Sequence, residues 1–140
     1  MTELTDGVIA FLSEGTRTAK LGYLAADGRP LVAPVWFVVD GGQLVFNTGR
    51  DTAKGRALVR DPRVVICVDD ERPPFSFVQV QGTATLGEDP EELLATATRI
   101  GGRYMGADRA EEFGRRNGVP GELVVRVTPT KVVKAFDLAD

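Results

Sequence analysis

The order of apolar and polar positions along the chain predicts mainly short β-strands. The segment 76–86 alternates cleanly, because its even-numbered positions are apolar or small and its odd-numbered positions are polar or aromatic. Other apolar and β-branched segments predict strands at 20–25, 30–39, 43–48, 63–68 and 122–136, the last interrupted at Pro129. Turn sequences at 26–29 and 40–42 join the first three of these strands as two successive hairpins, which predicts an antiparallel meander.

Four helices are expected around these strands. Thr5 or Asp6 can cap a first helix whose apolar side ends at Leu12, and Asp51 or Thr52 can cap a second that ends near residue 59. An Asp-Pro pair at 89–90 begins a third that runs toward residue 104, and a fourth covers 108–115. The pattern predicts one domain, 1–140, of mainly β (α+β) class, with six strands in a closed or nearly closed antiparallel barrel and peripheral helices.

The segment 31–39 is apolar on both faces of its expected strand. A strand of this kind is covered on both faces. In a chain of 140 residues one layer of secondary structure covers one face, and a second copy is the simplest cover for the other. The sequence therefore predicts a homodimer.

The composition is that of an ordinary soluble protein, with 43% hydrophobic and 26% charged residues. The net charge of −3 argues against a general attraction to nucleic acid or to acidic membranes. No segment approaches the roughly 18 apolar residues of a membrane span, and the acidic N-terminal segment does not resemble a signal peptide. The only cysteine, Cys67, excludes an intrachain disulfide and indicates a reducing, cytoplasmic environment.

Histidine is absent from the chain. Its absence excludes Ser-His-Asp and Cys-His catalysis, histidine-ligated zinc and histidine as a general base. No metal site is expected, and no catalytic side chain can be named. Any chemistry must depend on a bound cofactor or on carboxylate, Lys, Arg and Tyr side chains, and the partner is expected to be a small molecule.

Pro34 lies inside the apolar segment and has no N–H to donate to a β-ladder. It therefore marks a strand edge, a bulge or a place where the ladder opens. An opened ladder would leave backbone groups free to recognise the polar edge of a flat heterocycle. The residues alone favour the alternative, an edge strand whose proline prevents aggregation. Trp36 can stack on such a ring, although a tryptophan here is more often part of the core.

The segment 47–56 is the best candidate for an anion-binding site. A strand ends there, Gly49 allows a turn, and the free N–H groups of the following helix favour an anion. The glycine spacing differs from that of a Walker loop, and a capped surface helix with solvated basic side chains is an equally good interpretation. The hydroxyl groups and positive charges of the segment belong to Thr48, Arg50, Thr52, Lys54 and Arg56.

These pieces, taken in order, resemble the pyridoxamine 5′-phosphate oxidase-like split-barrel superfamily. Within it they are most similar to the branch of deazaflavin-dependent (coenzyme F420) reductases. The resemblance spans about residues 5 to 138, and no single motif carries it. The matching segments are Leu24–Pro30, Ala33–Phe37, Thr48–Lys54, Arg60–Val64, Val80–Ala84 and Arg103-Tyr104.

The resemblance implies a six-stranded antiparallel split β-barrel that forms a homodimer, with two cofactor sites in the grooves between the subunits. Phe77 and Gln79 would approach the cofactor from the partner. The tricyclic ring is expected along Ala33, Pro34, Val35 and Trp36. The phosphate is expected at Thr48, Arg50, Thr52 and Lys54, and Asn47 is a further expected cofactor-binding residue. Relatives often carry Asn three positions after the equivalent of Lys54; this chain has Ala57 there, and Arg56 is expected to substitute.

The implied activity is hydride transfer between coenzyme F420 and a small conjugated organic substrate, with the protein supplying orientation and a dry groove. The proton would come from solvent, from Tyr104 or from an arginine. Arg103 and Tyr104 can also touch a ligand tail, although a plain helix end is the favoured interpretation. Two alternatives stay open: an FMN-dependent oxidase or reductase of the pyridoxamine phosphate type, and a non-catalytic flavin- or tetrapyrrole-binding protein.

Overall fold

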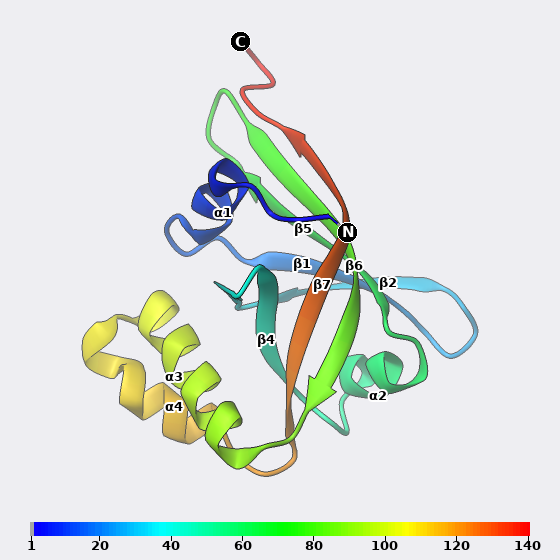
Figure 1. The fold of residues 1–140 in the computed structure, drawn as a ribbon, viewed down its shortest axis with the longest axis vertical. Coiled ribbons are helices and arrows are strands. Elements are labelled where there is room, and N and C mark those ends of the chain that lie inside the picture. Colours follow the sequence, from blue (N-terminus) through cyan, green and yellow to red (C-terminus); the bar gives the residue numbers. More distant parts are fainter. Residues whose placement is uncertain (1) are drawn as a thin grey trace.

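A computed structural model describes residues 2–140, which form seven strands, four α-helices and one 3₁₀ turn (Figure 1). The strands are β1 (Ala19–Leu24), β2 (Pro30–Val35), β3 (Val38–Asp40), β4 (Gln43–Gly49), β5 (Arg63–Asp70), β6 (Ser76–Gly87) and β7 (Glu122–Ala135). The helices are α1 (Asp6–Ser13), α2 (Ala53–Arg60), α3 (Pro90–Met105) and α4 (Ala110–Asn117), with the 3₁₀ turn Ala107–Arg109 before α4. The class is α+β.

Side-chain caps set the beginnings of three helices, as expected from the sequence. The Thr5 hydroxyl accepts from the N–H of Val8, and the Thr52 hydroxyl accepts from the N–H of Gly55. The Asp89 carboxylate accepts from the third residue of α3, which has proline in its first turn. Helices α3 and α4 pack together on one side of β4, and α2 lies on the opposite side of the sheet (Figure 1).

The strands form one antiparallel sheet in the order β2-β1-β5-β6-β7-β4-β3. The prediction of six strands is wrong, because the expected strand at 30–39 is divided into β2 and β3 by Trp36 and Phe37. The predicted meander is wrong for the same reason: β2 and β3 lie at opposite edges of the sheet. Within residues 2–140 no ladder joins these edges, so the sheet is curved but not closed.

Strands β6 and β7 form the longest pairing in the sheet. Their register shifts between Gln81 and Gly82, where Gly82 pairs with Pro129. This shift accounts for the interruption expected at the proline, which has no N–H for the ladder. A side chain at Gly82 would lie 2.5 Å from the carbonyl oxygen of Thr128, so the crossing of the two strands requires glycine.

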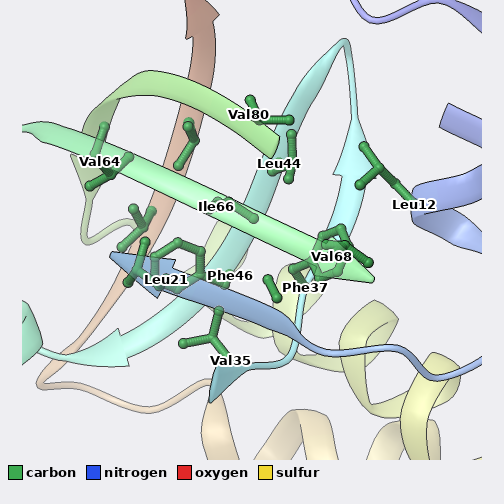
Figure 2. Packing of buried hydrophobic residues seen from close by; sticks show 14 of the residues in the cluster. Leu12, Leu21, Val35, Phe37, Leu44, Phe46, Val64, Ile66, Val68 and Val80 are labelled. Carbon is green, nitrogen blue, oxygen red and sulfur yellow. The ribbon is translucent and has the colours of Figure 1, made fainter. Parts of the chain in front are cut away.

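The core fills the concave side of the sheet (Figure 2). Phe37, Phe46 and Leu21 are fully buried there, together with Leu12 from α1. The alternation expected in 76–86 is confirmed, because the even-numbered positions up to residue 84 are all buried except the strand's first residue. Among residues 2–140 no helix is long and apolar enough to cross a membrane.

Strand β2 departs from the expectation that both its faces are covered. Val35 is buried against the core, but Leu31 is 38% and Val32 is 71% exposed. The strand also lies at the edge of the sheet, where β1 is its only neighbour. The apolar pattern of this strand therefore remains unexplained by contacts within the chain.

Candidate functional site

A cavity of about 240 Å³ brings together two segments that the sequence singled out separately. One wall comes from the end of β2 and the link to β3, and another comes from β4 and α2. Helices α3 and α4 and the start of β7 complete it. The lining residues are Pro34, Val35, Trp36, Asn47, Thr48, Lys54, Ala97, Ile100, Asn117 and Glu122.

The lining is divided by chemistry. Pro34, Val35 and Trp36 form an apolar wall. The facing residues of β4, Asn47 and Thr48, supply an amide and a hydroxyl. The Asn47 amide donates weakly to the carbonyl of Leu123 at 3.5 Å. The cavity thus offers a flat apolar surface beside hydrogen-bonding groups, which suits a ligand with a ring and a polar chain.

The tight start of α2 determines where Lys54 projects. Thr52 caps the helix, and its hydroxyl also donates to the Gly49 carbonyl at 2.7 Å. The Thr48 and Thr52 hydroxyl oxygens lie 3.4 Å apart. Gly55 is buried directly against the preceding turn: a side chain there would collide with the carbonyl oxygen of Gly49. Any larger residue at 55 must displace α2 from the cavity.

The three basic side chains expected to bind phosphate differ in whether they have a partner within the chain and whether they line the cavity. Lys54 lines the cavity and has no ion pair or hydrogen-bond partner within residues 2–140. Arg50 instead pairs with Glu88, and Arg56 donates to the carbonyl of Asp51. Of these three cations, only Lys54 is therefore both unpaired and directed to the cavity.

Glu122, at the start of β7, also lines the cavity and was not identified from the sequence. It pairs with Gly49 in the register of β4 and β7, and its Oε2 lies 3.0 Å from where a Gly49 side chain would begin. Burial raises the pKa of the Glu122 carboxyl above its usual value. Only the pairing of β4 with β7, which the sequence did not predict, reveals that this carboxylate and Lys54 line one cavity.

Six expected site residues do not line this cavity: Ala33, Arg50, Thr52, Arg56, Phe77 and Gln79. Ala33 pairs with the buried Leu21, so its side chain is on the core side of β2. Phe77 and Gln79 are on β6, and Gln79 lines a second, larger hollow of about 580 Å³ on the outer side of β1, β5 and β6. We treat the smaller cavity as the candidate site because it joins the ring and phosphate segments, and the larger hollow contains neither.

Two reactive groups are unsuited to chemistry at this site. Burial raises the pKa of the half-buried Cys67 thiol, which keeps it protonated, and Cys67 lies on β5 away from the cavity. Burial also raises the pKa of Tyr104, whose hydroxyl is bonded to Arg17 and Phe37. Within residues 2–140 no group of three or more metal-ligating side chains is present.

Comparisons with known proteins agree with this architecture. A family model described as Pyridoxamine 5'-phosphate oxidase matches residues 5–135. No curated protein matches the chain. Among solved structures, an F420 reductase is 26% identical, with a TM-score of 0.70 over 89% of this chain and 94% of its own.

Two further structures share the fold at lower identity. A conserved hypothetical protein from Mycobacterium tuberculosis is 24% identical, with a TM-score of 0.81 over 96% of this chain and 84% of its own. The heme storage protein HutZ from Vibrio cholerae is 20% identical, with a TM-score of 0.73 over 99% of this chain and 100% of its own. One architecture therefore occurs in proteins with different ligands.

Proposed function

The chain belongs to the pyridoxamine 5′-phosphate oxidase family, and from this premise we propose that it is a reductase that uses coenzyme F420. Its substrate would be a small conjugated organic molecule that accepts a hydride. The observation that carries the proposal is the cavity in which Pro34–Trp36 meet Thr48 and Lys54. Those are the two segments that the family resemblance assigns to the ring and to the phosphate.

The residues of the cavity fit a flavin-type group. Pro34 and Trp36 supply an apolar surface for a flat ring beside the buried Val35, and Lys54 supplies an unpaired cation for a phosphate. Thr48 adds a hydroxyl beside the capped start of α2, where an anion is favoured by the free N–H groups. When bound, the reduced cofactor supplies the hydride; this chain holds and orients it and keeps water from the ring.

Coenzyme F420 is preferred to FMN for two reasons. The F420 reductase is the most similar in sequence of the three structures compared above. The coenzyme also has an acidic tail beyond its phosphate, and Arg50 and Arg56 lie next to the start of α2, outside the cavity. FMN has no such tail. The tail of F420 would compete with Glu88 for Arg50 and with the Asp51 carbonyl for Arg56, so each arginine should contribute less than Lys54.

A second copy of the chain would complete the site. Val32 is 71% exposed on the open edge of the sheet, and Gln79 lines an outer hollow rather than the cavity. A partner that covers β2 would bury the apolar edge and bring Phe77 and Gln79 toward the cofactor, as the resemblance implies. The proposal is therefore a homodimer with two sites, and its single cysteine suits the cytoplasm.

A tetrapyrrole-storage role is the competing proposal, because HutZ shares the fold. The sequence has no histidine, so imidazole cannot ligate a heme iron in this protein. Nor does the described cavity contain a cysteine or methionine. The hydrogen-bonding groups and the unpaired Lys54 cation favour a phosphate-bearing ligand instead.

Titration of the purified protein with coenzyme F420, FMN and hemin tests the function directly. We expect saturable binding of F420, weaker binding of FMN, and oxidation of reduced F420 when quinones or enones are added. Saturable binding of hemin alone would overturn the proposal in favour of storage. Tight FMN binding without F420 binding would keep the site and change the cofactor.

A further inference from the structure

The link between β2 and β3 leaves a gap in the β-ladder that side chains of α3 fill. Phe37 has no strand partner, and its N–H donates to the Tyr104 hydroxyl at 3.2 Å. Its carbonyl accepts from Arg103 Nη1 at 2.7 Å. Two consecutive residues of one helix therefore satisfy both backbone groups of Phe37, whose ring is fully buried.

Tyr104 also holds the neighbouring indole. Its ring stacks on Trp36 with centroids 5.0 Å apart and planes 6° from parallel. Its hydroxyl donates to the carbonyl of Arg17 at 2.8 Å while accepting from Phe37. Both hydrogen-bonding roles of the hydroxyl are thus in use, and Tyr104 does not line the cavity. Trp36, which lines the cavity, therefore stacks on the Tyr104 ring, and two hydrogen bonds of the Tyr104 hydroxyl hold that ring in place.

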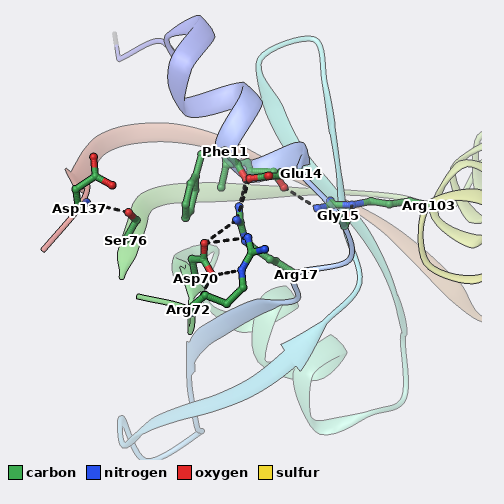
Figure 3. Close-up of polar contacts among 10 residues, drawn as sticks. Phe11, Glu14, Gly15, Arg17, Asp70, Arg72, Ser76, Arg103 and Asp137 are labelled. Carbon is green, nitrogen blue, oxygen red and sulfur yellow. Dashed lines mark hydrogen bonds and ion pairs between the residues drawn. The ribbon is translucent and has the colours of Figure 1, made fainter. Parts of the chain in front are cut away.

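Arg103 joins three separate parts of the chain at the same place. Its guanidinium donates to the carbonyls of Leu12 at 2.7 Å, Gly15 at 3.0 Å and Phe37 at 2.7 Å (Figure 3 shows the bond to Gly15). The guanidinium carbon lies 4.7 Å from the centroid of the Phe37 ring and 5.0 Å from that of Tyr104. No carboxylate pairs with Arg103 within residues 2–140, so its donors serve the backbone rather than a ligand.

We propose that Arg103 and Tyr104 are positioning residues that fix the Trp36 ring for the cofactor; the inference rests on the function proposed above. Trp36 is 37% exposed and lies in a two-residue link outside any strand. Without support such a side chain samples several rotamers, and binding must then restrict it. Stacking on Tyr104 removes that freedom before the ligand arrives. The hydroxyl of Tyr104 holds the stacking ring in place.

Trp36 is the only tryptophan, so fluorescence excited beyond the tyrosine absorption band reports its environment alone. The experiment compares wild type with Tyr104→Phe and Tyr104→Leu by acrylamide quenching of the apo protein, thermal melting, and titration with F420 and FMN. We expect quenching to increase in both variants, more in Tyr104→Leu. Affinity should fall about threefold to tenfold in Tyr104→Phe, the loss expected for a neutral hydrogen bond that orders a side chain.

Leu93→Ala provides the control for a merely structural role. Leu93 is 2% exposed on the same helix, belongs to the apolar cluster against which Tyr104 packs, and does not line the cavity. Its truncation should lower the melting temperature at least as much as Tyr104→Phe, with quenching and affinity close to wild type. Arg103→Lys keeps the charge but loses the fork of donors, so it should increase quenching as well.

Two different failures can be distinguished. If wild type binds F420 or FMN and Tyr104→Phe binds it equally well with unchanged quenching, the positioning role is wrong and the proposed function stands. It is also wrong if affinity in Leu93→Ala and Tyr104→Phe follows melting temperature alone. If wild type binds neither cofactor, the proposed function fails and takes this inference with it.

Discussion

The Arg50 guanidinium forms an ion pair with Glu88, with 2.6 Å between Nη1 and Oε1. Both side chains are about half exposed, at 55% and 53%. An exposed pair of this kind contributes only about 0–1 kcal/mol to stability. The pair nevertheless gives Arg50 a carboxylate partner, whereas Lys54 has none among the described residues and lines the cavity. The two cations should therefore differ in their importance for binding.

Lys54→Ala should weaken cofactor binding far more than Arg50→Ala. Loss of a charged hydrogen bond to a phosphate costs about 1.5–3 kcal/mol, or roughly ten- to a hundredfold in affinity. Arg50 must leave Glu88 before it can bind the ligand, so its removal should cost less than about threefold. Fluorescence titration with F420 measures both. Equal affinities of Lys54→Ala and wild type would show that the phosphate binds elsewhere.

Val32→Lys should abolish self-association without unfolding the chain. Val32 is 71% exposed on an edge strand, where an apolar row invites another chain and a lysine discourages it. Leu94→Lys is the control, because Leu94 is 44% exposed on α3, away from β2. Light scattering at micromolar concentration should report monomers for the first variant and dimers for the second. A wild-type monomer would contradict the dimer proposal at once.

The helices were predicted well because their signals are local. Thr5, Thr52 and the Asp89-Pro90 pair each act within one turn of chain, and each begins a helix in the structure. The break at Trp36 and Phe37 has no such signal. Both residues are good strand formers, and the groups that replace their ladder bonds come from Arg103 and Tyr104, far along the chain.

The candidate site was predictable in part for the same reason. Thr48 and Lys54 could be identified from the sequence as part of an anion site, because the end of a strand and the start of a helix are adjacent there. Which cations are free depends on distant carboxylates, such as the one that pairs with Arg50. Glu122 enters the cavity only through the pairing of β7 with β4, which is a long-range contact. Pro34 does lie on an edge strand, which agrees with the interpretation that the residues alone favoured.

Glu122 should make anion binding depend on pH. Burial raises the pKa of this carboxyl, and an anion in the same cavity would favour the protonated form further. Affinity for FMN should therefore fall as the pH rises through the pKa of Glu122. Glu122→Gln should bind more tightly at neutral pH, with a weaker dependence. Comparing the two proteins at each pH cancels the ionisation of the phosphate itself; parallel curves would refute this role.

The same carboxyl should affect stability with a defined sign. Because its pKa is raised in the folded protein, Glu122 stabilises the fold most below its unfolded pKa and loses that contribution as the pH rises through the folded value. In urea unfolding of the ligand-free protein, the free energy of unfolding of Glu122→Gln should therefore rise relative to that of wild type between mildly acidic and neutral pH. A constant difference across that range would mean that the carboxyl titrates normally in the fold.

Gly55→Ala tests whether the packing of α2 creates the cavity. A side chain at 55 would meet the backbone carbonyls of Gly49 and Arg50, which cannot rotate away, so the start of α2 must move. Overpacking of this kind costs about 1–3 kcal/mol, and displacement of Lys54 should also reduce F420 affinity.

Gly7→Ala is the matched control, because Gly7 is in α1 with nothing within 4 Å of the added methyl. It should keep full affinity and gain up to about 0.5–1 kcal/mol from helix propensity. Thermal melting and titration of both variants separate the effects: a Gly55→Ala protein that melts lower yet binds F420 as wild type does would place the ligand away from α2.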